Sequence, residues 1–172
     1  MTGNMNVKGR FRTECFRAGR LIWVDEGPNI VTDEGLNHML NVTLQAATAN
    51  ATWYCGIFKN NYTPITSSTA AAALGAAGLF GECQDADYGT PATNRPAYTV
   101  VASTAKSITN SASKATFTMS ASITVYGAFV ASSQAKTATT GVLYAGRKFD
   151  VARAVISADI LYVTYTINAS SS

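Results

Sequence analysis

Polar and apolar side chains alternate near the start of the chain in a way that is typical of a half-buried β-strand. Between residues 9 and 16, one face holds Phe11, Thr13 and Cys15, and the other holds Arg10, Arg12 and Glu14. A period of two residues places one face on a core and the other toward solvent. The pair Ala18-Gly19 can turn the chain, and the apolar residues 21–24 can form a second strand. The pattern therefore predicts a β-hairpin.

The same alternation returns in the C-terminal half of the chain. One face of the last predicted strand holds Leu161, Val163, Tyr165 and Ile167. We expect strands over residues 52–58, 97–103, 115–119, 122–130, 141–145 and 160–169. Many short strands separated by turn residues are typical of a β-sandwich or jelly roll. The predicted fold class is therefore all-β (β-sandwich or jelly roll), as a single domain over residues 9–172.

One segment, near residues 32–44, predicts a short α-helix. Thr32 is a candidate N-cap, and the acidic residues Asp33 and Glu34 suit the positive end of a helix dipole. Apolar side chains then recur at helical spacing, at Leu36, Met39, Leu40 and Leu44. Gly35 weakens a helix by up to about 1 kcal/mol. We therefore expect the apolar stripe to stabilise this helix by packing on the sheet.

Two stretches lack a clear period. Residues 1–8 predict a flexible N-terminal arm, which reaches a neighbouring subunit or is simply a frayed terminus. Residues 62–95 are rich in Ala, Gly, Pro and Asp and predict a long surface excursion. Long loops usually have a function, so the excursion is a candidate partner contact, with Tyr88 and Arg95 as candidate contact residues. It fits equally well as an ordered cover over one sheet edge.

The charge pattern limits the range of partners. Charged residues make up 13% of the 172 residues, about half the usual quarter, so little repulsion opposes packing against identical copies. The net charge of +3 arises in the first twenty residues, where Arg10, Arg12, Arg17 and Arg20 are candidate contacts to an acidic protein surface. A nucleic-acid surface would need a broader basic stripe with interleaved aromatic residues, so we expect no nucleic-acid partner.

The cysteine pattern and the hydropathy predict a reducing environment and no membrane. Cys15, Cys55 and Cys83 are odd in number and far apart, which argues against a disulfide framework. No signal-peptide pattern and no run of about 18 apolar residues is found. We expect a protein that is synthesised and kept in a reducing cytosol.

Motifs that carry chemistry are not found in the sequence. The chain contains neither a phosphate-binding GxxxxGK[ST] loop nor a GxSxG elbow nor HExxH. The lone His38 lies between apolar residues of the predicted helix, and Asp33-Glu34 suits the helix dipole. We therefore expect no enzyme, with no catalytic, cofactor-binding or metal-binding residues.

Three longer segments together carry a resemblance. They are GRFRTECFRAGRLIWVDEGPNIVTDEGLNHMLN, WYCGIF and NSASKATFTMSASITVYGAFVASS, followed later by GVLYAG. With them the chain resembles a family of tailed-bacteriophage virion structural proteins of the capsid cement or decoration type. The resemblance covers most of the chain, and the opening hairpin followed by a PNxVTxxGLN helix start is its most specific part. The alanine-rich segment 70–77 departs from the family by being longer and blander.

The resemblance implies a location and partners. Such a protein binds the outside of an icosahedral capsid, so its expected partners are the major capsid protein and itself, as a homodimer or homotrimer. Its expected location is the capsid exterior of the virion, after synthesis in the host cytoplasm. Two alternatives stay open: tail or head-fibre attachment, and a carbohydrate- or receptor-binding β-sandwich whose aromatic residues stack on sugars.

Overall fold

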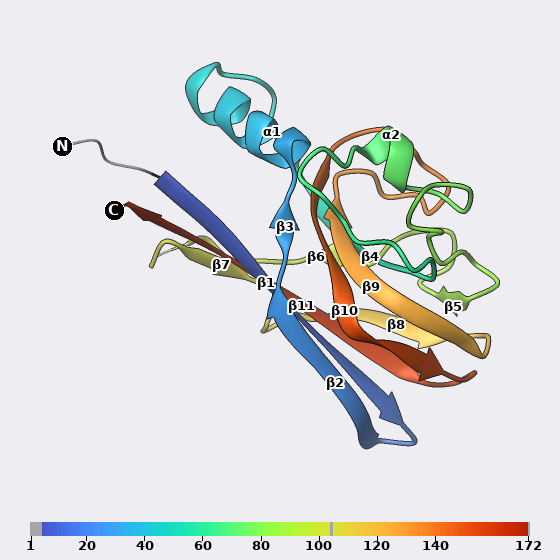
Figure 1. The fold of residues 1–172 in the computed structure, drawn as a ribbon. Helices are drawn as coiled ribbons and strands as arrows, with labels where there is room; N and C mark the ends of the chain where they lie inside the picture. The colour runs from blue at the N-terminus through green and yellow to red at the C-terminus, as the bar shows by residue number, and fades with distance from the viewer. Residues whose placement is uncertain (1–4, 104, 172) are drawn as a thin grey trace.

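Two antiparallel β-sheets pack face to face in a computed structural model that describes residues 5–103 and 105–171 (Figure 1). Sheet A has the order β2 (Arg20–Pro28), β1 (Met5–Arg17), β11 (Ile160–Ser171), β8 (Ala115–Met119) and β5 (Tyr88–Thr90), and β7 (Ser107–Thr109) also pairs with β11. Sheet B has the order β3 (Ile30–Val31), β10 (Leu143–Val155), β9 (Ile123–Ala131), β4 (Trp53–Phe58) and β6 (Ala97–Tyr98). The predicted all-β sandwich with one short helix is confirmed.

The main core lies between the two sheets. Phe11 of β1 stacks on Tyr165 of β11 with ring centroids 4.5 Å apart, and Ile57 of β4 and Val130 of β9 face them from sheet B. These side chains are at most 2% exposed. Burial of this apolar surface contributes about 25 cal/mol per Å² and is the main force that holds the sheets together.

Strand β1 is longer than the sequence predicts. The hairpin of β1 and β2 is confirmed, but residues 5–8 are not a flexible arm. Met5 to Lys8 pair with Ser171 to Asn168 at the end of β11. The prediction failed because β11 also extends further than expected and offers its backbone groups to this polar stretch. The other residues of the predicted arm, 1–4, lie outside the described residues.

Strand β10 is also longer than the predicted strand over residues 141–145. Arg147 and Asp150 follow that segment and give it the appearance of a loop in the sequence. Arg147 is nevertheless buried and donates to Asp25 of β2 at 2.9 Å. Because the buried Asp25 carboxylate accepts from the guanidinium group, the strand continues through these polar positions to Val155.

Helix α1 (Asp33–Leu44) begins as predicted but packs differently. Thr32 is the N-cap, and its hydroxyl accepts the Gly35 N–H at 3.1 Å. The apolar stripe packs only in part: Leu36 and Met39 are half-buried, whereas Leu40 and Leu44 are 43% and 80% exposed. The helix is attached by its first turn, where Glu34 accepts the Leu143 N–H at 2.7 Å and Gly35 is buried. The remaining turns project from the sandwich (Figure 1).

The excursion of residues 62–95 is a packed cover and contains the short helix α2 (Ala70–Ala73). It lies on the outer face of sheet B, where a second apolar cluster forms. Phe80 from the excursion stacks on Phe58 of β4 at 4.7 Å and contacts Phe129 of β9 at 5.5 Å. The ordered-cover interpretation therefore holds, although the cover lies over a sheet face and not only an edge.

Gly35 provides a test of how α1 is attached. A Cβ at this position would lie 2.6 Å from the carbonyl oxygen of Tyr144 in β10. We expect Gly35→Ala to lower the free energy of unfolding by about 1–3 kcal/mol in urea denaturation, because overpacking outweighs the gain in helix propensity. The control Asn37→Ala, at an exposed position of α1, should not lower it. A more stable Gly35→Ala protein would contradict the observed attachment.

Candidate functional site

Two of the four predicted contact arginines of the hairpin lie on the outer side of sheet A and are already paired with acids. Arg10 donates to Glu26 at 2.7 Å, and Arg12 donates to Glu26 at 2.8 Å. Arg12 also donates to Glu14, which Lys114 contacts as well. The alternation along β1 places Arg10, Arg12 and Glu14 on one face of the strand, as the sequence predicts. A partner would therefore meet a mixed-charge surface and not a purely basic one.

The other two arginines of this group lie at the end of the hairpin. Arg17 makes a double hydrogen bond to Asp159, at 2.8 and 2.9 Å. This bond is the main reason that the pKa of Asp159 lies below its ordinary value. Arg20 is exposed at the turn and has no ion pair with any described residue. Arg20 is thus the contact candidate that the fold leaves most available.

Arg95, in contrast, is not a surface contact residue. Its side chain is fully buried and bonds Glu82 through two nitrogens, at 2.6 and 2.7 Å. It also donates to the carbonyl oxygens of Ser133 and Ala138, at 2.6 and 3.0 Å. Burial raises the pKa of Glu82, and the bonds from Arg95 oppose that shift. The prediction of a partner contact at Arg95 is wrong, because Arg95 ties the excursion to the segment between β9 and β10.

Tyr88 is also buried and cannot contact a partner or stack on a sugar. Its ring lies 3.5 Å from the ammonium group of Lys136, which also donates to the Tyr88 carbonyl oxygen at 2.8 Å. Phe117 packs edge-on against the ring at 5.0 Å, and burial raises the pKa of Tyr88. In the sequence both Tyr88 and Arg95 lie among Asp, Gly and Pro residues, which gave no sign of the core that the excursion builds.

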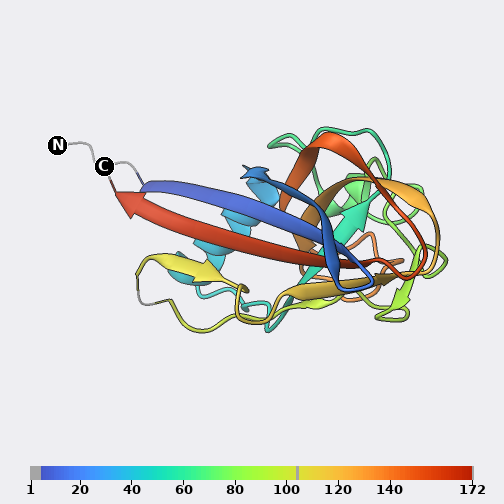
Figure 2. The same cartoon turned by 90° about the horizontal axis from the view of Figure 1, so that it is seen from below.

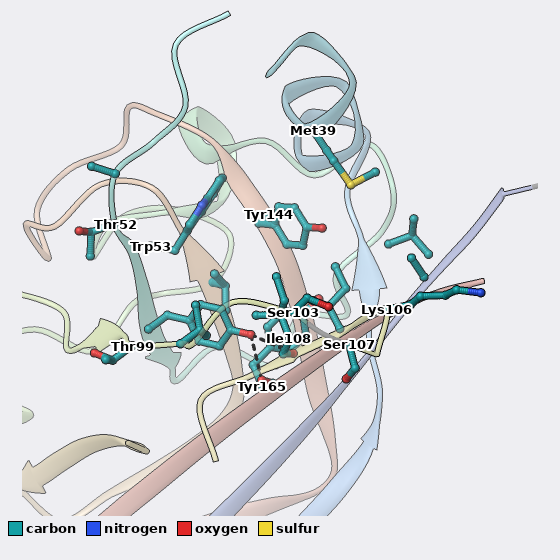
Figure 3. A pocket seen from close by; sticks show the side chains of 17 residues that line it. Met39, Thr52, Trp53, Thr99, Ser103, Lys106, Ser107, Ile108, Tyr144 and Tyr165 are labelled. Atoms are coloured by element: carbon teal, nitrogen blue, oxygen red, sulfur yellow. Dashed lines mark hydrogen bonds between the residues drawn. The ribbon is translucent and has the colours of Figure 1, made fainter. Parts of the chain in front are cut away.

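An apolar pocket of about 590 Å³ lies where the two sheets separate at one end of the sandwich. Figure 3 shows Trp53 and Tyr144 from sheet B, Tyr165 from sheet A and Met39 from α1 around this space. Residues 98–100, 103 and 106–108 line a further side. Sequence reasoning missed the pocket because its walls come from segments that are distant in the chain. The one available signal was the group of aromatic residues in the predicted strands.

The pocket is lined mainly by apolar groups. Tyr98 donates its hydroxyl to the carbonyl oxygen of Tyr165 at 3.1 Å, so this polar group is satisfied within the protein. Burial raises the pKa of Tyr144 to about 12, which keeps its hydroxyl protonated at neutral pH. Lys106 is the one charged residue among the described lining residues, and its ammonium group points away from the space (Figure 3). The volume lies within the range of small-molecule sites.

Groups with reactive or metal-binding chemistry are scattered or buried. Within residues 5–103 and 105–171, no group of three or more His, Cys, Asp and Glu residues could hold a metal ion. The thiols of Cys15, Cys55 and Cys83 are buried, and burial raises the pKa of Cys15 and Cys55 to about 12. Neither helix in the described part of the chain has the length and apolar character that a membrane crossing requires.

Comparisons with family models, with curated proteins and with solved structures yield no match to this chain.

Arg95 separates a structural role from a contact role. Arg95→Ala leaves the Glu82 carboxylate buried without its cation, so we expect the free energy of unfolding to fall by about 3–5 kcal/mol in urea denaturation. The matched variant Arg20→Ala removes an exposed arginine and should leave stability unchanged within error. Unchanged stability of Arg95→Ala would contradict the buried ion pair.

Proposed function

We propose that this protein is a virion structural protein of the capsid cement or decoration type. In this proposal it binds the outer surface of a capsid, strengthens contacts between capsomers, and acts as a homo-oligomer. The proposed class rests on a resemblance. The opening hairpin, the helix start and the later strands of the chain resemble those of such proteins. The distribution of exposed apolar side chains supplies the physical support.

Several large apolar side chains are exposed on elements that project from the sandwich. Leu40 and Leu44 lie on α1, and Leu44 is 80% exposed. Leu21 at the hairpin end is 51% exposed, Met5 at the start of β1 is 62% exposed, and Val101 is 77% exposed. Single exposed apolar residues are ordinary, but neighbouring ones on a projecting element, such as Leu40 and Leu44 on α1, favour contacts with other proteins. This is the observation on which the proposal rests.

The rest of the fold suits a rigid protein that links neighbouring capsomers. Two apolar clusters and the buried Arg95–Glu82 and Arg147–Asp25 pairs hold the sheets and the cover together. Many copies on a symmetric surface multiply the effect of modest individual contacts. A rigid protein with several projecting apolar contacts therefore fits a decoration role.

Helix α1 offers the most direct test of this role. We expect the double variant Leu40→Asp/Leu44→Asp to fold normally, because both side chains are exposed, but to lose at least about tenfold in affinity for capsids, because the new charges would be desolvated at the contact. Co-sedimentation with purified capsids of the cognate phage measures this affinity and the copy number. Asn41→Asp places a single negative charge at another exposed position of α1 and should bind normally.

The outcomes distinguish the locations. Stoichiometric binding to capsids that depends on Leu40 and Leu44 supports the proposal. Binding of the wild-type protein only to tails or head fibres contradicts its capsid part. Normal capsid binding by the double variant contradicts the contact through α1.

The aromatic pocket favours a second candidate, a ligand- or receptor-binding β-sandwich. Trp53 contacts Tyr144 there at a ring distance of 5.3 Å, and these rings could pack on a ligand. The lining has few polar groups, so it suits an apolar ligand better than a sugar, which needs many hydrogen bonds. Saturable binding to a glycan array that Trp53→Ala abolished, while Trp23→Ala did not, would favour the carbohydrate-binding alternative.

A further inference from the structure

The first half of β1 has an edge with no neighbour among the described strands. Strand β2 pairs with β1 only from Arg10 onward, and residues 5–9 pair with β11 alone. Figure 2 shows this part of β1 and β11 as a ribbon that extends beyond the sandwich toward the two termini. A groove of about 620 Å³ borders this edge, between Val7–Arg10 and Asn29–Val31. The edge is therefore open to another chain.

The hydrogen bonds of the neighbouring residues fix which backbone groups point to this edge. The carbonyl oxygen of Gly9 accepts the Asn29 N–H on the side away from β11. Ala169, which lies opposite Val7, directs its N–H to Lys106 and thus away from β1. Because backbone groups alternate along antiparallel strands, the N–H and C=O groups of Met5 and Val7 also point away from β11. Among residues 5–103 and 105–171, these donors and acceptors have no partner.

The composition of this segment does little to block pairing. Edge strands are usually protected by proline, by charges, by bulges or by a covering element. Residues 5–9 contain no proline and one charge, Lys8, and Met5 is 62% exposed. A free backbone edge beside an exposed apolar side chain favours the addition of another strand.

We propose that this edge pairs with the same edge of a second copy, antiparallel and across a two-fold axis at Asn6. Met5 of one copy then lies opposite Val7 of the other, in both directions, and Asn6 lies opposite Asn6. This register uses all the free N–H and C=O groups of Met5 and Val7. A register centred on Val7 would instead need the Gly9 carbonyl oxygen, which already accepts a bond. Backbone complementarity therefore selects one register.

Charge and packing agree with this register. The two Lys8 side chains lie four positions apart along the ladder, roughly 13 Å, so like charges do not oppose each other. Met5 and Val7 of opposite strands share a face and cover each other. The symmetry is closed, so the assembly is a dimer in which the two A sheets become continuous. The inference deepens the homo-oligomer of the proposed function, but it does not require a capsid to be tested.

The pairing can be tested with one symmetric cross-link. Asn6 would face its own counterpart at a Cα distance of about 4.5 Å, within disulfide range. We expect Asn6→Cys to form a covalent dimer under mild oxidation, as measured by non-reducing electrophoresis. The native cysteines are buried and do not compete. The control Lys8→Cys, also exposed on β1, should stay monomeric on the gel because its counterpart is too distant.

A second variant tests the backbone edge itself. Val7→Pro removes an N–H that points away from β11, so the β1–β11 ladder keeps its bonds while the dimer loses a donor from each copy. We expect the dimer Kd from sedimentation velocity to rise at least about tenfold. Val7→Ala keeps the N–H and should shift the Kd much less. Circular dichroism and urea unfolding of each variant confirm that the fold is retained.

The cross-linking and sedimentation experiments test the proposed dimer, and neither experiment requires a capsid. Cross-linking at Asn6 but not at Lys8, together with a weaker Val7→Pro dimer, supports it. A wild-type protein that stays monomeric at high micromolar concentration, or equal cross-linking at both positions, overturns it. Either of these failures leaves capsid binding, measured by co-sedimentation, as a separate question.

Discussion

Sheet B carries apolar side chains on both faces, and much of the structure follows from covering it twice. Ala128 and Val130 of β9 face sheet A, whereas Phe129 and Ala131 of the same strand face outward. Sheet A covers the first face. Because an exposed apolar sheet face would be costly in water, the second face needs its own cover, and the excursion of residues 62–95 supplies it. The sandwich is thus three layers deep on this side.

The buried pair of Arg95 and Glu82 fixes this third layer in place. Each partner would be costly to bury alone, and the pair is tolerated because the guanidinium group also donates to the carbonyl oxygens of Ser133 and Ala138. Lys136 closes the same region over the ring of Tyr88. Arg95 and Tyr88, the two contact residues predicted for the excursion, are both used internally. The excursion therefore offers fewer contact residues than the sequence predicts.

The projecting elements carry exposed groups that the fold itself does not use. Helix α1 is held by its first turn and leaves Leu44 exposed, while the β1–β11 ribbon leaves one backbone edge open. The two features lie on different elements and favour different partners: an apolar helix face suits another protein surface, and a strand edge suits an identical strand. A protein that pairs with itself and binds a capsid would use both. The aromatic pocket lies near α1 and is not needed for either contact.

The sequence by itself determined the elements whose signals are local. Alternation from residue 9 to residue 16 predicted the hairpin, and Thr32 with the acids that follow it predicted the start of the helix, because strand pleat and helix capping depend on neighbouring residues. Tertiary structure decided the rest. Residues 5–8 form a strand only because β11 lies beside them, and Arg95 is buried only because Glu82 meets it across the cover. Gly35, unfavourable in an isolated helix, is required by the close approach of Tyr144. Each of these outcomes depends on a residue that is distant in the sequence. A pattern of neighbouring residues cannot indicate such a contact.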